Sequence, residues 1–278
     1  MSRRSGQLNE GGLVAPGFVL LGLLIAWEAA VRVFSVRTYI LPPPSGIIER
    51  LIADWPLLAS NLHATLVVIG LGFLLAILIS LILGILIAHS NTFRRGVYPL
   101  VIASQTIPVI AVAPVLVIWF GYNIVPRVLI TALIAFFPLT VNVVTGFRSV
   151  DRETIDFVRS LGASRLQVFL KVSIPTAMPF IFAGLKVSAT LAVIGATVSE
   201  WMGADRGLGN LIFVDTSQLH TVRVFASIAL LSACGITLFC LIVLIERLSL
   251  PWHYSDQAIG IRLRVMPGRA RRPRSTDS

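Results

Sequence analysis

Residues 148–179 have the sequence RSVDRETIDFVRSLGASRLQVFLKVSIPTAMP, a charged segment that lies between two long apolar runs. Its first half has the pattern of a short helix. Asp151 stands where a side chain can cap a helix N-terminus, and apolar residues recur on one helical face as far as Leu161. Gly162 follows, at a position where helices commonly end in a left-handed residue. We therefore expect a helix that ends at Gly162.

A second short helix is predicted directly after this glycine. Ser164 and Gln167 have the spacing of a capping box, in which each side chain bonds the backbone N–H of the other residue. Its apolar face would consist of Leu166, Phe169 and Leu170. We expect Ile174-Pro175 to end this helix, because proline cannot continue the hydrogen-bonding pattern. Two helices that expose apolar side chains to water leave a surface on which a partner can dock.

The rest of the chain has the composition of a membrane protein. Of its 278 residues, 56% are hydrophobic and 13% are charged, and the mean hydropathy is +0.87. A soluble domain has about 25% charged residues. This composition excludes a soluble globular enzyme, a disordered protein and a disulfide scaffold. Cys234 and Cys240 lie in one apolar run and are expected to pack as small side chains.

Several apolar runs are long enough to cross a bilayer, which requires about 20 residues per helix. We predict six spans, at residues 14–34, 65–88, 98–120, 128–147, 180–202 and 222–246. Pro108 and Pro114 interrupt the third run, and proline at membrane depth is tolerated where neighbouring helices or a cavity satisfy the freed carbonyl groups. The first run lacks a good cleavage site, so we expect it to remain as a helix and not to be removed as a signal peptide.

The distribution of basic residues predicts that both termini are cytoplasmic. With the N-terminus inside, most of the 23 Lys and Arg residues fall on the inner side. Lys186 is expected near the inner end of the fifth run, where its side chain can reach the interface. The net charge of +10 is thus explained by topology, and no nucleic-acid motif accompanies it. We expect residues 1–13 to form a cytoplasmic segment and residues 255–278 to form a basic, disordered cytoplasmic tail.

A short amphipathic helix is predicted on the outer surface, between the first two runs. Leu41-Pro42-Pro43-Pro44 cannot be helical, and Ser45 then stands in a good N-cap position. The apolar residues that share one face are Ile47, Ile48, Leu51, Ile52 and Trp55.

Within the charged segment, Asp156-Phe157-Val158 is followed after three residues by Gly162, with Ala163 and Ser164 behind it, and after nine residues by Val172-Ser173-Ile174-Pro175. This spacing resembles the EAA loop of permease subunits of binding-protein-dependent ABC importers. That family has Glu-Ala-Ala, three residues, Gly, nine residues and Ile-x-Leu-Pro. Asp156 keeps the acidic charge, whereas Phe157 is bulkier than the usual alanine. The resemblance implies that the loop is a coupling helix, which lies in a groove of an ATP-binding subunit.

Other features over residues 38–254 occur in the order typical of the same family. They are Leu41-Pro42-Pro43-Pro44-Ser45, Thr65, Pro108, Pro114, Trp119-Phe120-Gly121, Phe137-Pro138, Ser160-Leu161-Gly162-Ala163-Ser164, Pro175-Thr176-Ala177-Met178-Pro179, Gly184-Leu185-Lys186, Glu200-Trp201, Gly207-Leu208-Gly209, Glu246-Arg247 and Pro251-Trp252. The resemblance implies an all-α membrane protein with the MetI-like type I fold of ABC importer permeases, in which residues 14–254 form a six-span domain. It also implies a multi-pass protein of the bacterial cytoplasmic (inner) membrane. The implied partners are two ATP-binding subunits, a second permease copy in a homodimer, and an extracytoplasmic solute-binding protein.

The solute is less strongly indicated than the permease role. The resemblance is to the subgroup that moves nitrate, sulfonates, taurine and vitamin precursors. Gln105-Thr106-Ile107-Pro108 and Ala113-Pro114 look most like permeases for vitamin-type heterocycles, such as riboflavin or the hydroxymethylpyrimidine precursor of thiamine. Nitrate, sulfonate and taurine remain alternative solutes. An ion-coupled secondary transporter is an alternative of another class, which predicts paired buried carboxylates or an inverted repeat, and neither is evident in the sequence.

The sequence contains no evident nucleotide or metal site. A P-loop requires Lys before Ser or Thr, whereas Lys171 and Lys186 each precede a valine. We therefore expect ATP and Mg²⁺ to be bound by a separate subunit, and this chain to be neither an enzyme nor the holder of a cofactor. The four histidines are isolated along the chain and have no metal-ligand spacing.

Candidates for the translocation path are the residues Gln105, Thr106, Pro108, Asn142 and Glu200. Neutral polar groups at membrane depth either line a cavity or bond across helices. Glu200, beside Trp201, is either an ordinary interfacial residue or a gate or substrate-facing group. For Glu28 we expect an ion pair with Arg32, one turn further along the first span.

Overall fold

The computed structural model describes residues 14–251, with side chains from residue 17 onward. Within this range the chain forms helices and no strands, in agreement with the all-α fold class. The helices are α1 (Val14–Val33), α2 (Pro44–Ala53), α3 (Trp55–His89), α4 (Asn91–Ser104), α5 (Val109–Phe120), α6 (Ile124–Arg148), α7 (Arg152–Ser160), α8 (Arg165–Val168), the π-helical turn η1 (Phe169–Ser173), α9 (Ile174–Trp201), α10 (Leu208–Ser217) and α11 (Thr221–Ser249). The expected segment 1–13 and tail 255–278 lie outside the described residues.

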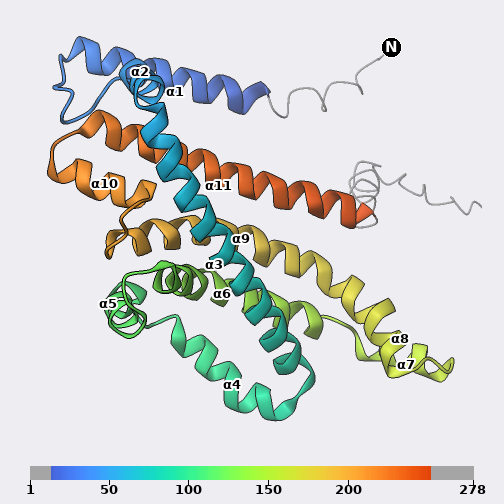
Figure 1. Cartoon of the computed structure of the whole chain (residues 1–278). Coiled ribbons are helices and arrows are strands. Elements are labelled where there is room, and N and C mark those ends of the chain that lie inside the picture. Colours follow the sequence, from blue (N-terminus) through green and yellow to red (C-terminus); the bar gives the residue numbers. More distant parts are fainter. Residues whose placement is uncertain (1–13, 252–278) are drawn as a thin grey trace, which may run out of the picture.

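Helices α3, α6 and α9 form the centre of the molecule, and α6 shares its most extensive contact with α9 (Figure 1). Helices α1 and α11 lie on one side of this centre, and α4 and α5 lie on the other. Helices α7 and α8 form one end of the molecule, called the loop end below. Helices α2 and α10 lie toward the opposite end, called the far end. Figure 1 shows that α1 begins, and α11 ends, toward the loop end.

Small and hydroxyl-bearing residues allow the central helices to approach closely. A Cβ atom on Gly146 of α6 would lie 2.9 Å from the carbonyl oxygen of Ala177 in α9, so only glycine fits there. Between α3 and α6, the Ser80 hydroxyl donates to the Phe136 carbonyl oxygen over 2.9 Å. Such contacts drive helix association in a bilayer, because lipid tails are as apolar as the side chains that would otherwise be buried.

Four of the described helices are long and apolar enough to cross a membrane: α3, α6, the continuous helix 165–201, and α11. The pair α4 and α5 makes a fifth if it is counted as one broken span. The first of the six expected spans corresponds to helix α1, Val14–Val33, which is not among these candidate spans. Six spans and cytoplasmic termini therefore remain predictions. The helix that contains the second predicted span, residues 65–88, is longer than that run and begins at Trp55, directly after Asp54.

The run over residues 98–120 is interrupted at Pro108, as predicted, whereas Pro114 lies inside α5. Helix α4 ends at Ser104, α5 begins at Val109, and the two are bent by 99°. Pro108 is the N-cap of α5 and has an extended backbone, with φ −68° and ψ 100°. Proline has no N–H to donate to the carbonyl group four residues earlier, and the extended backbone of Pro108 separates α4 from α5. The third run is therefore a pair of helices bent at Pro108.

The prediction that Ile174-Pro175 ends the second loop helix is wrong. Helices α8, η1 and α9 run on as one helix of 37 residues, from Arg165 to Trp201. The π-helical turn Phe169–Ser173 directly precedes Pro175. A wider turn relieves the clash between a proline ring and the carbonyl group four residues earlier, which is why the helix passes through the proline. The loop is thus joined directly to the fifth run.

The contacts of Glu28 explain how α2 begins. Pro43 and not Ser45 is its N-cap residue, so the expected cap is wrong. The Ser45 N–H donates to Glu28 Oε2 over 3.0 Å, and the Ser45 hydroxyl donates to Glu28 Oε1 over 2.8 Å. The expected pair is confirmed, since Arg32 Nε donates to Glu28 Oε1 over 2.6 Å. A carboxylate from α1 therefore stabilises the N-terminus of α2.

Candidate functional site

The first helix of the charged loop has the predicted beginning and end. Asp151 is the N-cap of α7, and its Oδ1 accepts a hydrogen bond from the Glu153 N–H over 3.2 Å. Gly162 has φ +86°, the left-handed conformation that was expected. Its N–H donates to the Arg159 carbonyl oxygen over 2.9 Å and so satisfies one of the last carbonyl groups of the helix. The left-handed backbone at Gly162 thus ends α7 and redirects the chain toward α8.

The second helix begins with the predicted capping box. The Gln167 N–H donates to the Ser164 hydroxyl over 3.3 Å, and the Ser164 N–H donates to Gln167 Oε1 over 2.8 Å. These two bonds satisfy backbone donors that no intrahelical partner reaches. Together with Asp151 and Gly162, the box gives the loop a defined shape in spite of its exposure.

The loop exposes apolar side chains at the loop end of the molecule. Phe157 is 65% exposed and Leu161 is 72% exposed. In α8 and η1, Leu166 and Leu170 are exposed by 64% and 51%. Asp156, beside Phe157, is exposed as well. An apolar patch with charged neighbours on two short, well-capped helices is typical of a surface that binds another protein.

Three aromatic rings attach the loop to the central helices. Phe147, near the end of α6, stacks on Phe169 of η1 with ring centroids 5.7 Å apart and an interplanar angle of 7°. His89, the last residue of α3, contacts both rings edge-on, at 5.6 Å from Phe147 and 5.5 Å from Phe169. Edge-to-face and stacked pairs favour fixed relative positions. The loop is therefore in contact with α3 and α6 and is continuous with α9.

The remaining residues of the EAA-like pattern lie where the loop joins α9. Val172 and the buried Ser173 belong to η1, whereas Ile174 and Pro175 open α9. In the loop itself, Val158 and Ala163 are half-buried. The pattern thus covers both the exposed surface and its connection to the membrane helix. Whether these residues contact an ATPase stays a prediction.

The candidate path residues occupy three separate places. Gln105, Thr106 and Pro108 share the exposed bend between α4 and α5, where the Thr106 hydroxyl donates to the Ala103 carbonyl oxygen over 2.7 Å. Asn142 is half-buried in α6 and donates to the Pro138 carbonyl oxygen over 2.8 Å.

Glu200 lies at the end of α9 and is fully buried. Its carboxylate is therefore packed inside the protein and not exposed at its surface. A role in the path stays a prediction for all five candidates.

An ion pair that the sequence did not reveal joins α9 to α11. Lys186 Nζ donates to both carboxylate oxygens of Glu246, over 2.9 Å and 3.2 Å. The Lys186 side chain is 25% exposed and that of Glu246 is 6% exposed. Lys186 was expected near the inner end of the fifth run, and its partner Glu246 lies three residues before the end of α11, so the pair stands toward the loop end of α11.

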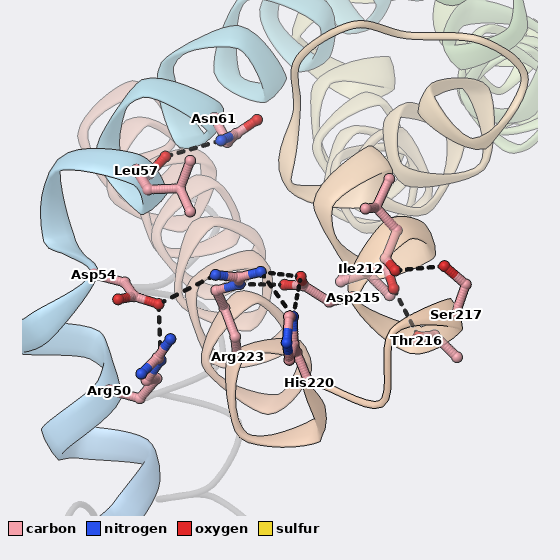
Figure 2. Close-up of polar contacts among 11 residues, drawn as sticks. Arg50, Asp54, Leu57, Asn61, Ile212, Asp215, Thr216, Ser217, His220 and Arg223 are labelled. Atoms are coloured by element: carbon pink, nitrogen blue, oxygen red, sulfur yellow. Dashed lines mark hydrogen bonds and ion pairs between the residues drawn. The ribbon is translucent and has the colours of Figure 1, made fainter.

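A second unexpected cluster, at the far end, is centred on Arg223 (Figure 2). Its guanidinium group forms two hydrogen bonds with the fully buried carboxylate of Asp215, one of them 2.6 Å long. Arg223 Nη1 lies 3.6 Å from Asp54 Oδ2, and Arg50 Nε lies 2.8 Å from the same oxygen. His220 Nδ1 lies 3.1 Å from Arg223 Nη2. The cluster joins α2, the α2–α3 junction, α10 and α11.

Comparison with known proteins identifies the family. Residues 76–249 match the family described as "Binding-protein-dependent transport system inner membrane component". The chain belongs to this family. The matched range runs from within α3 to the end of α11 and so contains the charged loop of this permease, whereas α1 and α2 precede it.

Curated relatives of the permease resemble it over nearly their whole length. It is 40% identical to the formylaminopyrimidine transport permease protein ThiX of Halalkalibacterium halodurans, over 90% of this chain and 98% of ThiX. It is 38% identical to the riboflavin transport system permease protein RibX of Chloroflexus aurantiacus, over 91% of this chain and 95% of RibX. It is 30% identical to the taurine transport system permease protein TauC of Escherichia coli, over 83% and 86% of the two chains.

A solved structure supports the fold of the permease. The inward-facing MetNI methionine ABC transporter contains a chain that matches with a TM-score of 0.51, at 19% identity, over 68% of this chain and 98% of that chain. At this level of identity the likeness shows the fold alone, and it confirms the expected MetI-like architecture. Within residues 14–251, no three His, Cys, Asp or Glu side chains form a group that could hold a metal ion.

Proposed function

We propose that this permease forms the translocation path of an ATP-driven importer for a vitamin-type heterocycle, either riboflavin or a pyrimidine precursor of thiamine. ATP is hydrolysed by a separate ATP-binding subunit, present in two copies, and two permease copies enclose the path. The solute arrives on an extracytoplasmic binding protein. Membership of the binding-protein-dependent family supports this assembly.

The exposed, capped loop is the observation that carries the proposal. It presents Phe157 and Leu161 to solvent, on helices whose ends are fixed by Asp151, Gly162 and Ser164. A surface of this kind can enter a groove of a partner without first having to fold, which lowers the entropic cost of binding. The loop end then faces the cytoplasm, where an ATPase has access to ATP.

Transport follows from movement of this loop. Closure of two ATP-binding subunits around ATP displaces the two loops, and the helices that continue from them change their inclination. The path then opens outward to receive the solute from the binding protein, and it opens inward after hydrolysis. Because the loop is attached to α3, α6 and α9, all three central helices take part in the change.

Reconstitution tests this function. The permease, its ATP-binding subunit and its binding protein are incorporated in lipid vesicles, and uptake of labelled solute is measured with ATP and with a non-hydrolysable analogue. We expect uptake with ATP and no uptake with the analogue. Uptake that requires an ion gradient and proceeds without the ATP-binding subunit would instead establish an ion-coupled secondary transporter.

Titration of the binding protein identifies the solute. The similarity to ThiX and RibX, named for formylaminopyrimidine and riboflavin, favours a heterocycle. The similarity to permeases named for taurine and aliphatic sulfonates supports the second candidate class. We expect tight binding of riboflavin or hydroxymethylpyrimidine. Binding of nitrate, a sulfonate or taurine in its place would reassign the solute and leave the permease role intact.

A further inference from the structure

The N-terminus of α10 is capped by side chains from two other helices. Three consecutive backbone N–H groups at its start each donate to a buried side-chain oxygen. The bonds are Gly207 N–H to Asn61 Oδ1 over 2.8 Å, Leu208 N–H to Thr65 Oγ1 over 2.8 Å, and Gly209 N–H to Glu200 Oε2 over 2.7 Å. The acceptors belong to α3 and α9. These N–H groups have no partner within α10 itself, so its start depends on these two helices.

Glu200 is the centre of this cap. Its side chain is fully buried, and its Oε2 also accepts a hydrogen bond from the buried Thr65 hydroxyl over 3.1 Å. A Cβ atom on Gly209 would lie 2.9 Å from the same oxygen, so the carboxylate fits closely against the backbone. The hydrogen-bond partners of Glu200 are neutral groups, and its Oε2 lies at the positive end of the α10 dipole.

One continuous helix links this cap to the charged loop. It runs from Arg165 in the loop to Trp201, directly after Glu200. At a rise of about 1.5 Å per residue, its 37 residues span about 55 Å. A shift or rotation of the loop is therefore carried along the helix to Glu200 at the far end.

The other end of α10 is attached to different elements. Asp215 bonds Arg223 of α11, and Arg223 reaches Asp54 between α2 and α3 (Figure 2). Helix α10 is thus held by α9 and α3 at its start, and by α11 and the α2–α3 junction near its end. Among the residues that hold α10, Glu200 is the one that belongs to α9, the helix that is continuous with the charged loop.

We propose that Glu200, with Thr65 and Asn61, is a positioning group that makes α10 move with α9, so that ATPase closure at the loop end reshapes the far end. This inference rests on the proposed function. It assigns Glu200 a role that needs no contact with the solute. The far end is where the binding protein would release its solute, so α10 would link hydrolysis to that release.

Thr65→Val tests the link with little change in side-chain shape. It removes the acceptor for the Leu208 N–H and the donor to Glu200. Thr216→Val is the matched control, because the Thr216 hydroxyl lies exposed on α10 and bonds only the Ile212 carbonyl oxygen within that helix. The readout is the ratio of ATPase activity with and without loaded binding protein, in vesicles that contain the complete transporter. We expect Thr65→Val to lower this ratio about tenfold and Thr216→Val to leave it within about twofold.

Distance measurements separate coupling from a purely structural role. Spin labels are placed at Gln218→Cys, at the end of α10, or at Arg159→Cys, in the loop, after Cys234→Ala and Cys240→Ala remove the native thiols. Each experiment measures the distance between the same label on the two permease copies. In the unaltered transporter we expect this distance to change on ATP binding at both label positions. In Thr65→Val the change should persist at residue 159 and vanish at residue 218.

Two results would overturn the inference. One is an equal change at residue 218 with and without Thr65→Val, and the other is an equal loss at both positions. Glu200→Gln keeps an acceptor oxygen for the Gly209 N–H and should retain most of the stimulation, whereas Glu200→Leu should not. If the unaltered transporter shows neither stimulation nor a change at residue 159, the proposed function itself fails, and the two failures are thereby distinguished.

Discussion

Lys186 Nζ lies 2.9 Å from Glu246 Oε2, and this ion pair joins α9 to α11 within the helix bundle. Glu246 is nearly inaccessible to solvent. The surroundings are apolar, because Phe182, Ala189, Ile242 and Leu250 form a buried cluster between the same two helices. Lys186 thus provides a paired cation for a nearly buried carboxylate, at a contact between α9 and α11 that the apolar cluster also stabilises.

Loss of either partner should destabilise the permease more than loss of both. Lys186→Met leaves the carboxylate buried without its partner, and we expect a cost of about 3–5 kcal/mol in the free energy of unfolding. The double variant Lys186→Met with Glu246→Leu removes both charges and should recover most of that cost. Thermal unfolding of the single and double variants in the same detergent gives the coupling energy. Additive losses would show that the pair does not stabilise this contact.

Gly162→Val should uncouple ATP hydrolysis from transport. Gly162 has φ +86°, a conformation that β-branched residues rarely adopt, so valine will force the turn between α7 and α8 into another shape. No atom lies within 4 Å of a Cβ built on Gly162, so the effect comes from the backbone and not from a clash. We expect ATPase activity without matching uptake in vesicles that contain the complete transporter.

Gly96→Val is the matched control, because Gly96 lies in α4, outside the loop, where a Cβ atom also meets open space and no positive φ is required. Uptake should remain close to that of the unaltered protein. Unimpaired transport by a well-expressed Gly162→Val permease would count heavily against the coupling role of the loop.

The capping signals of the charged loop could be read from the sequence because they are local, whereas the cap expected at Ser45 was wrong because Glu28 of another helix binds that residue. Asp151, Gly162, Ser164 and Gln167 act on residues within a few positions, and the structure confirms each of them. The pattern around Asp156 is likewise a matter of spacing along the chain, and it led to the correct family.

The unpredicted features depend on residues far apart in the chain. Glu200 was recognised as unusual, but its partner Thr65 lies on another helix, and no periodicity shows that α10 begins beside both. Arg223 pairs with Asp215 eight residues earlier, but also with Asp54, for which the sequence contains no signal. The passage of the helix through Pro175 required a π-helical turn, which has no sequence signature of its own. Tertiary packing decided these features.

Ser164→Ala should weaken the attachment of the ATP-binding subunit. The substitution removes the acceptor for the Gln167 N–H, and a lost cap costs about 1 kcal/mol of helix stability. Because α8 is only the first turn of the long helix, fraying there should disorder the exposed loop and leave the bundle intact. We expect the affinity for the ATP-binding subunit to be about fivefold weaker. It is measured as binding of that subunit to permease immobilised on a surface in detergent. Ser160→Ala, in which the lost hydroxyl bonds only the Phe157 carbonyl oxygen, should bind as the unaltered protein does.

The two acidic partners of Arg223 should differ in their contribution to stability. Asp215 is fully buried and binds the guanidinium group through both oxygens, so Asp215→Ala leaves Arg223 with only its longer ion pair to Asp54 and should cost about 3 kcal/mol or more. Asp54 lies 3.6 Å from Arg223 Nη1 and its side chain is 18% exposed, so Asp54→Ala should cost about 1 kcal/mol. Arg223→Met combined with Asp215→Leu should be less harmful than Asp215→Ala alone. Unfolding measurements that rank Asp54→Ala as the more harmful change would show that the α2–α3 junction, and not α10, is the main attachment of α11 at the far end.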